Sequence, residues 1–545
     1  MARVLGVLLC LLALFSSSLC LDHANGRGDQ ALAQINVYET SLALDSSVKL
    51  HASPQVLGSQ SRCNIPLLIS IWQYMYCNSH PDYMKSGNVT LKFQIINQRA
   101  DVSFALFSNG VQEPHLLGVS NPVAFFNPKA PVYPRLALGK NWDEMTVTWT
   151  SGYNIDEAVP FIEWSAKGLP ARRSPAGTLT FNRNSIYIYR LGHDLVNGST
   201  IWSKNYTFVS SPYPGQDSKQ RVIIFGDMGK GERDGSNEYN DYQPGSLNTT
   251  DQVIKDLKDI DIVFHIGDLT YSNGYLSQWD QFTAQVQPIA STVPYMIASG
   301  NHERDWPDTG SFYAGTDSGG ECGVPAETMF YFPAENRAKF WYKTDYGMFR
   351  FCVADSEHDW REGTEQYKFI ENCLATVDRK TQPWLIFIAH RVLGYSTNDW
   401  YGKEGTFEEP MGRESLQKLW QKYKVDLAFY GHVHNYERTC PIYESQCVNN
   451  DKDHYSGTFK GTIHVVVGGA GSHLSPFSSL VPKWSLVRDY DFGFVKLTAS
   501  DHSSLLFEYK KSSTGQVYDS FNISRDYRDV LACTHDSCEP TTSAG

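Results

Sequence analysis

Hydrophobic and polar residues alternate with a period of two through the first half of the chain, from about residue 36 to residue 213. Clear examples are residues 88–95 and 145–149, which are rich in Val, Thr and Phe and are bounded by Gly, Pro and Asn. This alternation predicts β-strands separated by turns. A break between Pro122 and Pro134 divides the strands into an N-terminal β unit, residues 21–125, and a sandwich-sized unit, residues 126–213.

The pattern changes after a Pro- and Gly-bearing linker at residues 210–219. Short apolar runs then alternate with helical stretches, and we expect buried strands at residues 221–225, 262–266, 295–298, 385–389 and 425–430. A helix is expected over Thr250–Asp259, with Asn248 or Thr249 as its cap. This β-α-β order predicts an α/β sandwich over residues 220–500, followed by C-terminal strands and a tail, residues 490–545.

The N-terminus has the order of a secretory signal peptide. Arg3 precedes an apolar run from Val4 to Phe15, and small residues continue to Cys20, so we expect a signal peptide at residues 1–20. A membrane anchor is the alternative, but the run is shorter than the ~20 apolar residues that span a bilayer. The chain is therefore expected to be secreted, without a membrane partner. Sequons predict glycosylation at Asn88, Asn197, Asn205, Asn248 and Asn522.

Export favours disulfide bonds among the nine cysteines that follow Cys20. Close spacing suggests three local pairs and a weaker fourth: Cys63 with Cys77, Cys440 with Cys447, Cys533 with Cys538, and Cys352 with Cys373. Cys322 is left over, and it is either free or joins two copies of the chain in a homodimer.

Length and charge narrow the class of protein. The 545 residues suffice for two to four domains, and 41% hydrophobic residues provide ample apolar surface for their cores. The formal net charge is −12, from 47 Lys and Arg against 59 Asp and Glu. This acidic balance disfavours a nucleic-acid partner.

Polar residues follow each of the five predicted buried strands. The strands run into Gly226-Asp227-Met-Gly, Gly267-Asp268-Leu-Thr-Tyr271, Gly300-Asn301-His302-Glu303, His390, and Gly431-His432-Val-His434. Taken singly, such an Asp can cap a helix, an Asn-His pair can form a turn, and a lone His can be a core residue. Ligands gather at the carboxyl ends of strands in open α/β sheets, so the five groups together predict a metal site.

These five blocks resemble those of the purple acid phosphatases, within the metallophosphoesterase superfamily. Residues 136–140 and 145–149 are similar to the fibronectin III-like domain that precedes the catalytic domain in plant members. The N-terminal β unit resembles the larger plant subgroup. The resemblance implies a fibronectin III-like sandwich at residues 126–213, a calcineurin-like catalytic domain, and secretion to the extracellular space, cell wall or vacuole.

The resemblance also implies a ligand for each of two metal ions. Asp227, Tyr271 and His434 would hold Fe(III), and Asp268 would bridge the two ions. A divalent ion, Zn, Mn or Fe, would bind to Asn301, His390 and His432. The residue types agree with this division, because anionic oxygens suit a hard trivalent cation and neutral amide and imidazole groups suit a divalent one.

The implied reaction is attack of a metal-bound hydroxide on a phosphoric monoester at acid pH. Asn301 and His302 would contact the phosphoryl group, and His302 would assist the leaving group. Glu303 is interpreted as an acceptor that orients a histidine, His358 as structural, and Arg391 and Lys403 as surface cations.

One departure from the family pattern bears on the substrate. Plant members carry further histidines about ten residues beyond the His390 position, where this chain has Asp399 and Trp400. The favoured interpretation is a secreted acid phosphatase acting on small phosphate esters. The alternatives are a nucleotide pyrophosphatase or phosphodiesterase, and a catalytically weak, metal-bearing extracellular protein.

Overall fold

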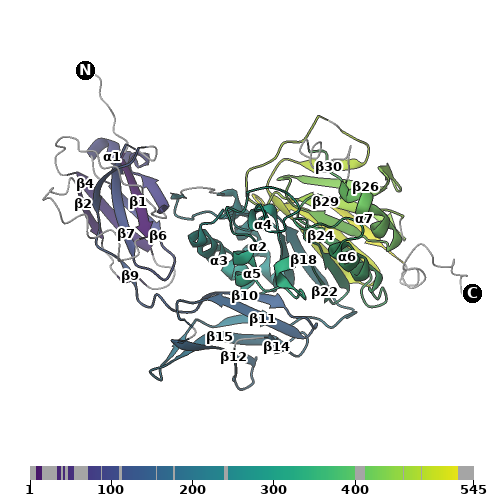
Figure 1. Ribbon diagram of the computed structural model, residues 1–545, viewed down its shortest axis with the longest axis horizontal. Helices are drawn as coiled ribbons and strands as arrows, with labels where there is room; N and C mark the ends of the chain where they lie inside the picture. Colours follow the sequence, from purple (N-terminus) through teal and green to yellow (C-terminus); the bar gives the residue numbers. More distant parts are fainter. Residues whose placement is uncertain are drawn as a thin grey trace, which may run out of the picture.

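The fold divides into three consecutive units, seen in the ribbon of the computed structural model (Figure 1). The structure describes residues 8–14, 33–37, 41–42, 47–54, 71–86, 89–109, 113–154, 156–175, 178–238, 243–398, 411–457, 460–479 and 481–525. An N-terminal β unit and a second β unit precede a larger α/β unit, which confirms the predicted fold class.

In its described residues, the N-terminal unit is built from short strands and one α-helix. Its elements are β1 (Leu8–Leu14), β2 (Ala33–Val37), β3 (Ser41–Leu42), β4 (Ser47–Pro54), β5 (Ile71–Tyr76), α1 (Pro81–Ser86), β6 (Val89–Gln94), β7 (Val102–Ser108), β8 (His115–Val119) and β9 (Ala124–Phe125). One sheet has the order β19-β5-β1-β7-β8, in which β19 (Asn237–Glu238) comes from the α/β unit, and another has the order β2-β4-β6. Strand β1 lies within the apolar run assigned to the signal peptide, whose cleavage stays a prediction.

The second unit is a β-sandwich. Its strands are β10 (Val132–Leu138), β11 (Glu144–Thr150), β12 (Ala158–Ala166), β13 (Arg172–Pro175), β14 (Thr178–Thr180), β15 (Ile186–Leu195), β16 (Thr200–Trp202) and β17 (Tyr206–Val209). The order β10-β11-β14 makes one sheet, and β13-β12-β15-β16 makes the other, with β17 also paired to β15. Aromatic rings of Phe181, Tyr187 and Phe208 contact one another in its core. The aromatic content of this half therefore serves packing.

Two mixed sheets form the α/β unit. The first has the order β21-β20-β18-β31-β32-β33-β28, and the second has the order β22-β23-β24-β25-β29-β26-β27, with β30 beside β26. In the first sheet β18, β20 and β21 are parallel, and in the second β23, β24, β25 and β29 are parallel. Strands β31 to β33 complete the first sheet, so the predicted C-terminal strands belong to this unit.

The bounds of the α/β unit agree closely with the apolar runs. Its strands are β18 (Gln220–Phe225), β19 (Asn237–Glu238), β20 (Ile262–Ile266), β21 (Tyr295–Ala298), β22 (Tyr342–Tyr346), β23 (Phe349–Val353), β24 (Trp384–Ala389), β25 (Leu427–Tyr430), β26 (Tyr436–Tyr443), β27 (Gln446–Cys447), β28 (His454–Ser456), β29 (Thr462–Val467), β30 (Ser485–Asp489), β31 (Gly493–Asp501), β32 (Ser504–Lys511) and β33 (Val517–Ser524). Its α-helices are α2 (Gly245–Asp256), α3 (Leu276–Ala290), α4 (Asn301–Arg304), α5 (Val324–Met329), α6 (Glu365–Ala375) and α7 (Met411–Lys422).

One hydrophobic core fills the space between the two sheets. It includes Ile224 and Phe264 from the first sheet and Phe351 and Phe429 from the second, and all four side chains are buried. A separate core includes residues of α6 and α7, among them Leu374 and Trp420. Continuous apolar strands are expected where both faces of a sheet are covered.

Helix α2 begins earlier than the sequence pattern predicted. It starts at Gly245 directly after Pro244, and Asn248 and Thr249 lie inside the helix instead of capping it. The proline ring fixes a helical φ of −64° at that position, so the chain is already prepared to turn into a helix. Thr249 is polar for a different reason, since its hydroxyl forms a hydrogen bond with the Ser512 hydroxyl at 2.6 Å.

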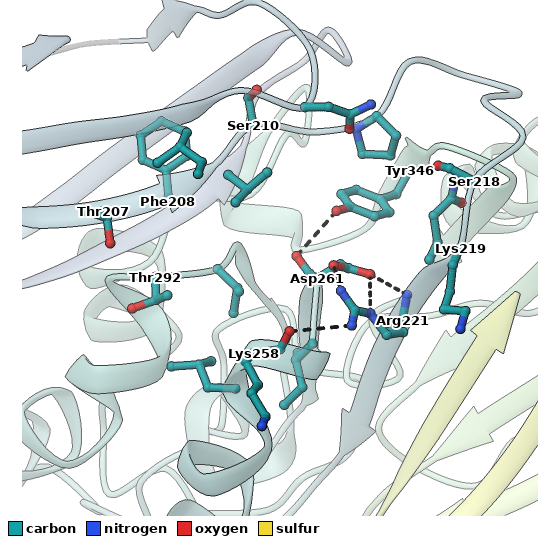
Figure 2. Close-up of a pocket in the computed structure, with 18 residues that line it drawn as sticks. Thr207, Phe208, Ser210, Ser218, Lys219, Arg221, Lys258, Asp261, Thr292 and Tyr346 are labelled. Atoms are coloured by element: carbon teal, nitrogen blue, oxygen red, sulfur yellow. Dashed lines mark hydrogen bonds and ion pairs between the residues drawn. The ribbon is translucent and has the colours of Figure 1, made fainter. Parts of the chain in front are cut away.

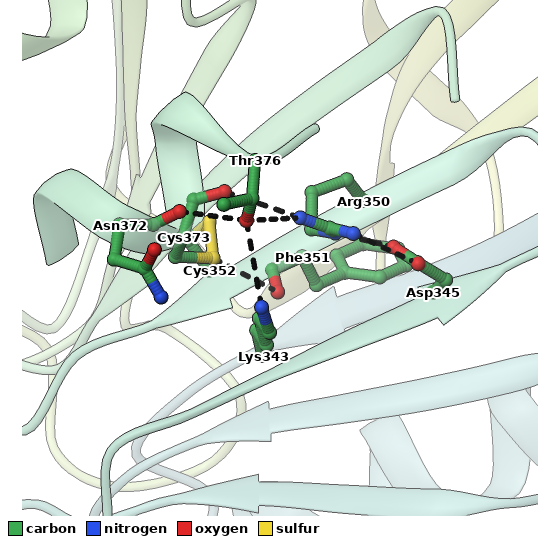
Figure 3. The surroundings of a disulfide bond; sticks show 8 residues. All are labelled: Lys343, Asp345, Arg350, Phe351, Cys352, Asn372, Cys373 and Thr376. Carbon is green, nitrogen blue, oxygen red and sulfur yellow. Dashed lines mark hydrogen bonds and ion pairs between the residues drawn. A yellow bond between two sulfur atoms is a disulfide. The ribbon is translucent and has the colours of Figure 1, made fainter. Parts of the chain in front are cut away.

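Two of the four predicted disulfide bonds lie among the described residues, and both are present. Cys440 pairs with Cys447, and Cys352 pairs with Cys373 to join β23 to α6 (Figure 3). Beside the second bond, the buried Arg350 donates to the Cys373 carbonyl at 3.1 Å and pairs with Asp345. Cys322 is unpaired among the described residues, and Cys63, Cys533 and Cys538 lie outside them.

The N-terminal unit docks on the α/β unit through polar contacts. Strand β19 pairs with β5, and the backbone N–H of Gln94 donates to Asp234 at 2.6 Å. Arg99 forms an ion pair with the almost fully buried Asp280 of α3. None of the helices in the described part of the chain has the length and apolar character of a membrane-spanning segment.

Candidate metal centre

The five predicted strand ends meet at one place in the α/β unit. Asp227 follows β18, Asp268 and Tyr271 follow β20, and Asn301 opens the short helix α4 after β21. His390 directly follows β24, and His432 and His434 follow β25. Because parallel strands end at the same edge, two sheets packed face to face bring all seven side chains together.

The backbone at these positions adopts conformations that few side chains tolerate. Asp227, Asp268, Tyr271 and His432 have φ angles of 61°, 50°, 53° and 65°. A positive φ in a non-glycine residue costs roughly 1–3 kcal/mol and is concentrated at functional sites. Glycine is required at Gly300, where a Cβ atom would overlap the Asp268 carboxylate.

One half of the site contains carboxylate, phenol and imidazole groups. The Tyr271 hydroxyl lies 3.2 Å from Asp227 Oδ1 and 3.0 Å from His434 Nε2. His434 Nε2 is 3.2 Å from the same Asp227 oxygen, and its Nδ1 donates to the His473 carbonyl at 2.7 Å. Ligand atoms of Asp227, Asp268 and His434 lie within 4.8 Å of one another.

The other half contains one amide and two imidazoles around the same aspartate. Asn301 Oδ1 lies 3.0 Å from both His390 Nε2 and His432 Nδ1. His390 Nε2 is 3.3 Å from Asp268 Oδ1. Asp268, His390 and His432 also present ligand atoms within 4.8 Å of one another, so Asp268 belongs to both halves.

Burial and charge make the cluster suited to cations. Asp227 and Asp268 are at most 1% exposed. Burial opposes ionisation of Asp268, but the neighbouring His390, His302 and His432 hold its pKa well below the usual range. Burial and the Asp227 charge raise the pKa of Tyr271 well above its usual range. Buried anionic oxygens and imidazoles at these separations fit a pair of metal ions.

His302 lies at the more accessible side of the cluster. Its backbone N–H donates to Asp268 Oδ1 at 3.0 Å, and its Nδ1 contacts Asn273 Oδ1 at 2.9 Å. The ring packs against Tyr271, with 4.4 Å between the ring centroids. His302 therefore lies beside the seven residues but belongs to neither of the two groups whose ligand atoms lie close together.

The structure corrects the interpretations that the sequence suggested for Glu303 and Arg391. Glu303 does not orient a histidine, because its carboxylate accepts the backbone N–H groups of Asp268 and Leu269 at 2.8 Å each, and so fixes the Asp268 loop. Arg391 is not a surface cation, since its side chain is only 7% exposed and pairs with Glu357 and Asp305 at 2.9 Å each.

Three contributors to the site were missed or undervalued from the sequence. Asp317 accepts from Asn301 Nδ2 at 2.9 Å and thereby points the amide oxygen toward the histidines. Arg391 lies 3.3 Å from His432 Nε2. The exposed His473 packs on His434, with ring centroids 4.4 Å apart. The glycine-rich run before His473 follows strand β29, so a sixth strand-end signal was present in the sequence.

Other candidates do not join the cluster. His358 is held by Asp355 at 2.6 Å and by Arg304 at 3.3 Å, in agreement with a structural role. Asp399, Trp400 and Lys403 lie outside the described residues. A cavity of about 390 Å³ lies between the sandwich and the α/β unit, but its lining contains none of the seven residues (Figure 2). There Arg221 is already paired with Asp261 at 2.8 Å.

The fold and the site together define a metallophosphoesterase. The family model of calcineurin-like phosphoesterases matches residues 220–436. The Fn3-like domain from purple acid phosphatase matches residues 43–127, and the iron/zinc purple acid phosphatase-like C-terminal domain matches residues 461–520. The Fn3-like match falls on the N-terminal unit, whereas residues 136–149 suggested the second unit. Both units consist of short strands in which hydrophobic and polar residues alternate, so the sequence patterns of the two units are alike.

Comparison with individual relatives identifies the family to which the chain belongs. The chain is 87% identical to probable inactive purple acid phosphatase 24 of Arabidopsis thaliana over the full length of both. It is 74% identical to a nucleotide pyrophosphatase/phosphodiesterase of Hordeum vulgare, over 64% of this chain and 95% of that protein. The solved purple acid phosphatase from yellow lupin (Lupinus luteus) seeds is 58% identical, with a TM-score of 0.88 over 95% of this chain and all of its own. The chain belongs to the purple acid phosphatase family.

Proposed function

We propose that this chain hydrolyses phosphoric esters at acid pH, with a dinuclear metal centre formed by the seven clustered residues. The observation that carries the proposal is the presence of two buried ligand groups that share Asp268. When bound, a pair of metal ions supplies an activated water molecule and neutralises charge on the phosphate oxygens.

The donor atoms support different ions in the two halves. Asp227, Tyr271 and His434 would hold Fe(III), because a carboxylate and a phenolate are hard anionic donors. Burial raises the pKa of the Tyr271 phenol and so opposes its ionisation. A trivalent cation favours the phenolate more strongly than a divalent cation does. Asn301, His390 and His432 would hold Zn, Mn or Fe(II), and Asp268 would bridge the ions.

His302 and Asn301 would contact the substrate. With Nδ1 held by Asn273, the His302 ring has a fixed orientation that places Nε2 as its second hydrogen-bonding atom. From this position His302 would donate a hydrogen bond to the phosphoryl group and a proton toward the leaving oxygen. The backbone bond from His302 to Asp268 ties this residue directly to the bridging ligand.

A second candidate function is hydrolysis of nucleotide diphosphates or phosphodiesters. The barley relative is named for that activity, and residues 391–401 of this chain contain no histidine. An alkyl alcohol is a poor leaving group that needs a proton donor, whereas a phosphate leaving group is a much weaker base. A site with fewer proton donors should therefore lose less activity on phosphoanhydrides than on alkyl monoesters.

The experiment that separates these functions is a substrate panel with the purified protein. The kcat/KM values of an alkyl monoester, a diester and a nucleotide diphosphate would be measured from pH 4 to 8, with metal content determined on the same samples. We expect the anhydride to react faster than the alkyl ester, and Asp399→His to narrow the gap. A high alkyl rate that Asp399→His leaves unchanged would show that another residue supplies the proton.

A catalytically weak protein is the third alternative, and the name of the Arabidopsis relative keeps it open. The complete ligand set supports retained metal binding, but only turnover tests retained chemistry. A protein that holds both metals and hydrolyses nothing in the panel would establish this alternative.

Secretion and glycosylation belong to the same proposal. Asn197, Asn205, Asn248 and Asn522 are exposed, which glycan attachment requires, although Asn248 lies in α2 and Asn522 in β33 instead of in loops. Asn88 lies outside the described residues. Mass spectrometry of the protein secreted from plant cells, before and after deglycosylation, tests both the sites and the cleavage near Cys20.

A further inference from the structure

Two histidines of the site present their ring nitrogens in the usual manner of metal ligands. His390 Nδ1 lies 3.0 Å from the Ile266 carbonyl, and His434 Nδ1 lies 2.7 Å from the His473 carbonyl. A carbonyl oxygen only accepts, so each ring holds its proton on Nδ1 and directs the Nε2 lone pair into the cluster. A backbone carbonyl at the remote nitrogen orients such a ligand and increases its basicity.

His432 is arranged in the opposite way. It faces the cluster with Nδ1, 3.0 Å from Asn301 Oδ1, while its Nε2 lies 3.3 Å from Arg391 Nη1. A guanidinium has donors and no acceptor, and it stays charged in proteins. The bond from Arg391 therefore favours the ring form that carries its proton on Nδ1, and Nδ1 is the atom that would have to bind the metal.

Arg391 is fixed in this position. Its Nε donates to both oxygens of Glu357, at 2.9 and 3.0 Å, and its Nη2 donates to Asp305 at 2.9 Å. The guanidinium also lies over the Tyr313 ring, 3.9 Å from the centroid. Both carboxylates are fully buried, so the cation cannot leave without stranding them in the interior.

We infer that Arg391 is a positioning residue that weakens binding of the second metal ion at the half-site of Asn301, His390 and His432. Two effects act in the same direction. Binding there must move the His432 proton from Nδ1 to Nε2, where it faces the Arg391 donors, and the guanidinium charge repels the incoming cation. This inference rests on the proposed dinuclear centre. It predicts that loss of the Arg391 guanidinium strengthens binding of the second ion and leaves binding of the first unchanged.

The test is a metal titration that does not depend on activity. Iron-loaded protein would be dialysed against a chelator and titrated with Zn²⁺, with the Kd of the second ion followed by calorimetry and metal content by elemental analysis. Arg391→Gln should bind the second ion about 10- to 100-fold more tightly, the usual scale for outer-shell partners of a metal ligand. The introduced glutamine amide carries no charge, and its oxygen accepts a hydrogen bond from the Nε2–H group of His432.

Two further variants make the result specific. Arg350→Gln removes another buried arginine that is held by a carboxylate, at the Cys352–Cys373 disulfide, and should leave both affinities unchanged. If Arg391→Gln fails to fold because Glu357 and Asp305 are left unpaired, the double variant Arg391→Gln/Glu357→Gln restores the charge balance and is titrated instead.

The outcomes separate this inference from the proposed function. Tighter binding of the second ion alone supports the inference, whereas a change in both affinities would indicate a merely structural role and overturn it. Wild-type protein that binds the second ion as tightly as the variant also overturns it while leaving the dinuclear centre intact. Wild-type protein that binds neither ion overturns the proposed function as well.

Discussion

At the scale of single residues, the site depends on atoms that serve two neighbours at once. Asp268 Oδ1 is close to His390 Nε2 and accepts the backbone N–H of His302. Asn301 Oδ1 is shared by His390 and His432. Substitutions at such atoms should therefore affect both halves of the site together, whereas substitutions at residues that contact one half should not.

The proposed bridging role of Asp268 predicts a difference between two alanine variants. Asp268→Ala should lose both metals, because it deletes the shared anionic ligand and leaves two cations to repel each other. His302→Ala should retain the metals and lower turnover by about 10²- to 10⁴-fold. Elemental analysis and kcat on the same preparations check this. Loss of metal from His302→Ala would mean that His302 is itself a ligand.

The Tyr271 hydroxyl predicts an optical signature. If Tyr271 binds Fe(III) as a phenolate, the purified protein should be violet or pink, and Tyr271→Phe should lose the visible band while staying folded. Absorption spectra with far-UV circular dichroism as the folding control measure both properties. Colourless wild-type protein that nevertheless holds one Fe(III) would contradict the assignment of Tyr271.

At the scale of elements, a buried acid fastens the loop after Tyr271 to helix α3. Glu321 accepts the backbone N–H of Gly274 at 2.9 Å and the Trp279 indole N–H at 3.0 Å. Burial raises the pKa of Glu321 to about 7, although both of these bonds oppose the rise. An unfolded glutamate has a pKa of about 4.3, so between these two values the folded state binds more protons than the unfolded state.

Stability should therefore fall as the pH rises from about 4 to 7, by at most about 1.4 kcal/mol for each pH unit. Glu321→Gln should remove this slope, at a constant cost from the lost acceptor of one N–H group. Urea denaturation of wild type and variant at several pH values measures the difference. The exposed Glu335→Gln is the control for deleting one negative charge. If the free energy of unfolding depends on pH in the same way in wild type and Glu321→Gln, Glu321 is ionised throughout this range.

At the scale of the whole molecule, the N-terminal unit and the α/β unit are joined by contacts between residues that are far apart in sequence. The Arg99–Asp280 ion pair links the N-terminal unit to α3, where the Asp280 side chain is 4% exposed. Arg99→Ala should expose β5 and β6 to faster hydrogen exchange and lower the free energy of unfolding by about 1–3 kcal/mol, because Asp280 loses its partner. Lys129→Ala breaks a more exposed pair with Glu157 and should therefore change stability much less. Equal effects of the two variants would contradict a docking role for Arg99.

The sequence alone determined the elements and the chemistry that follows them. Apolar runs such as residues 262–266 and 385–389 became buried strands within a residue or so of the expected bounds, because burial on both faces requires continuous apolar residues. The residues Asp227, Asp268, Asn301, His390 and His432 were identifiable because each follows such a strand. Two disulfide bonds were predictable because their cysteines lie close in sequence.

Tertiary structure alone decided what surrounds those residues. Arg391 follows His390 in sequence, but only the packing of Glu357, Asp305 and Tyr313 around it makes it a buried cation beside His432. Glu303 supports the Asp268 loop, and Asp317 orients Asn301, through hydrogen bonds that span 34, 35 and 16 residues. Local patterns report which face of an element is buried, whereas partners brought together by chain folding depend on how two sheets are placed against each other.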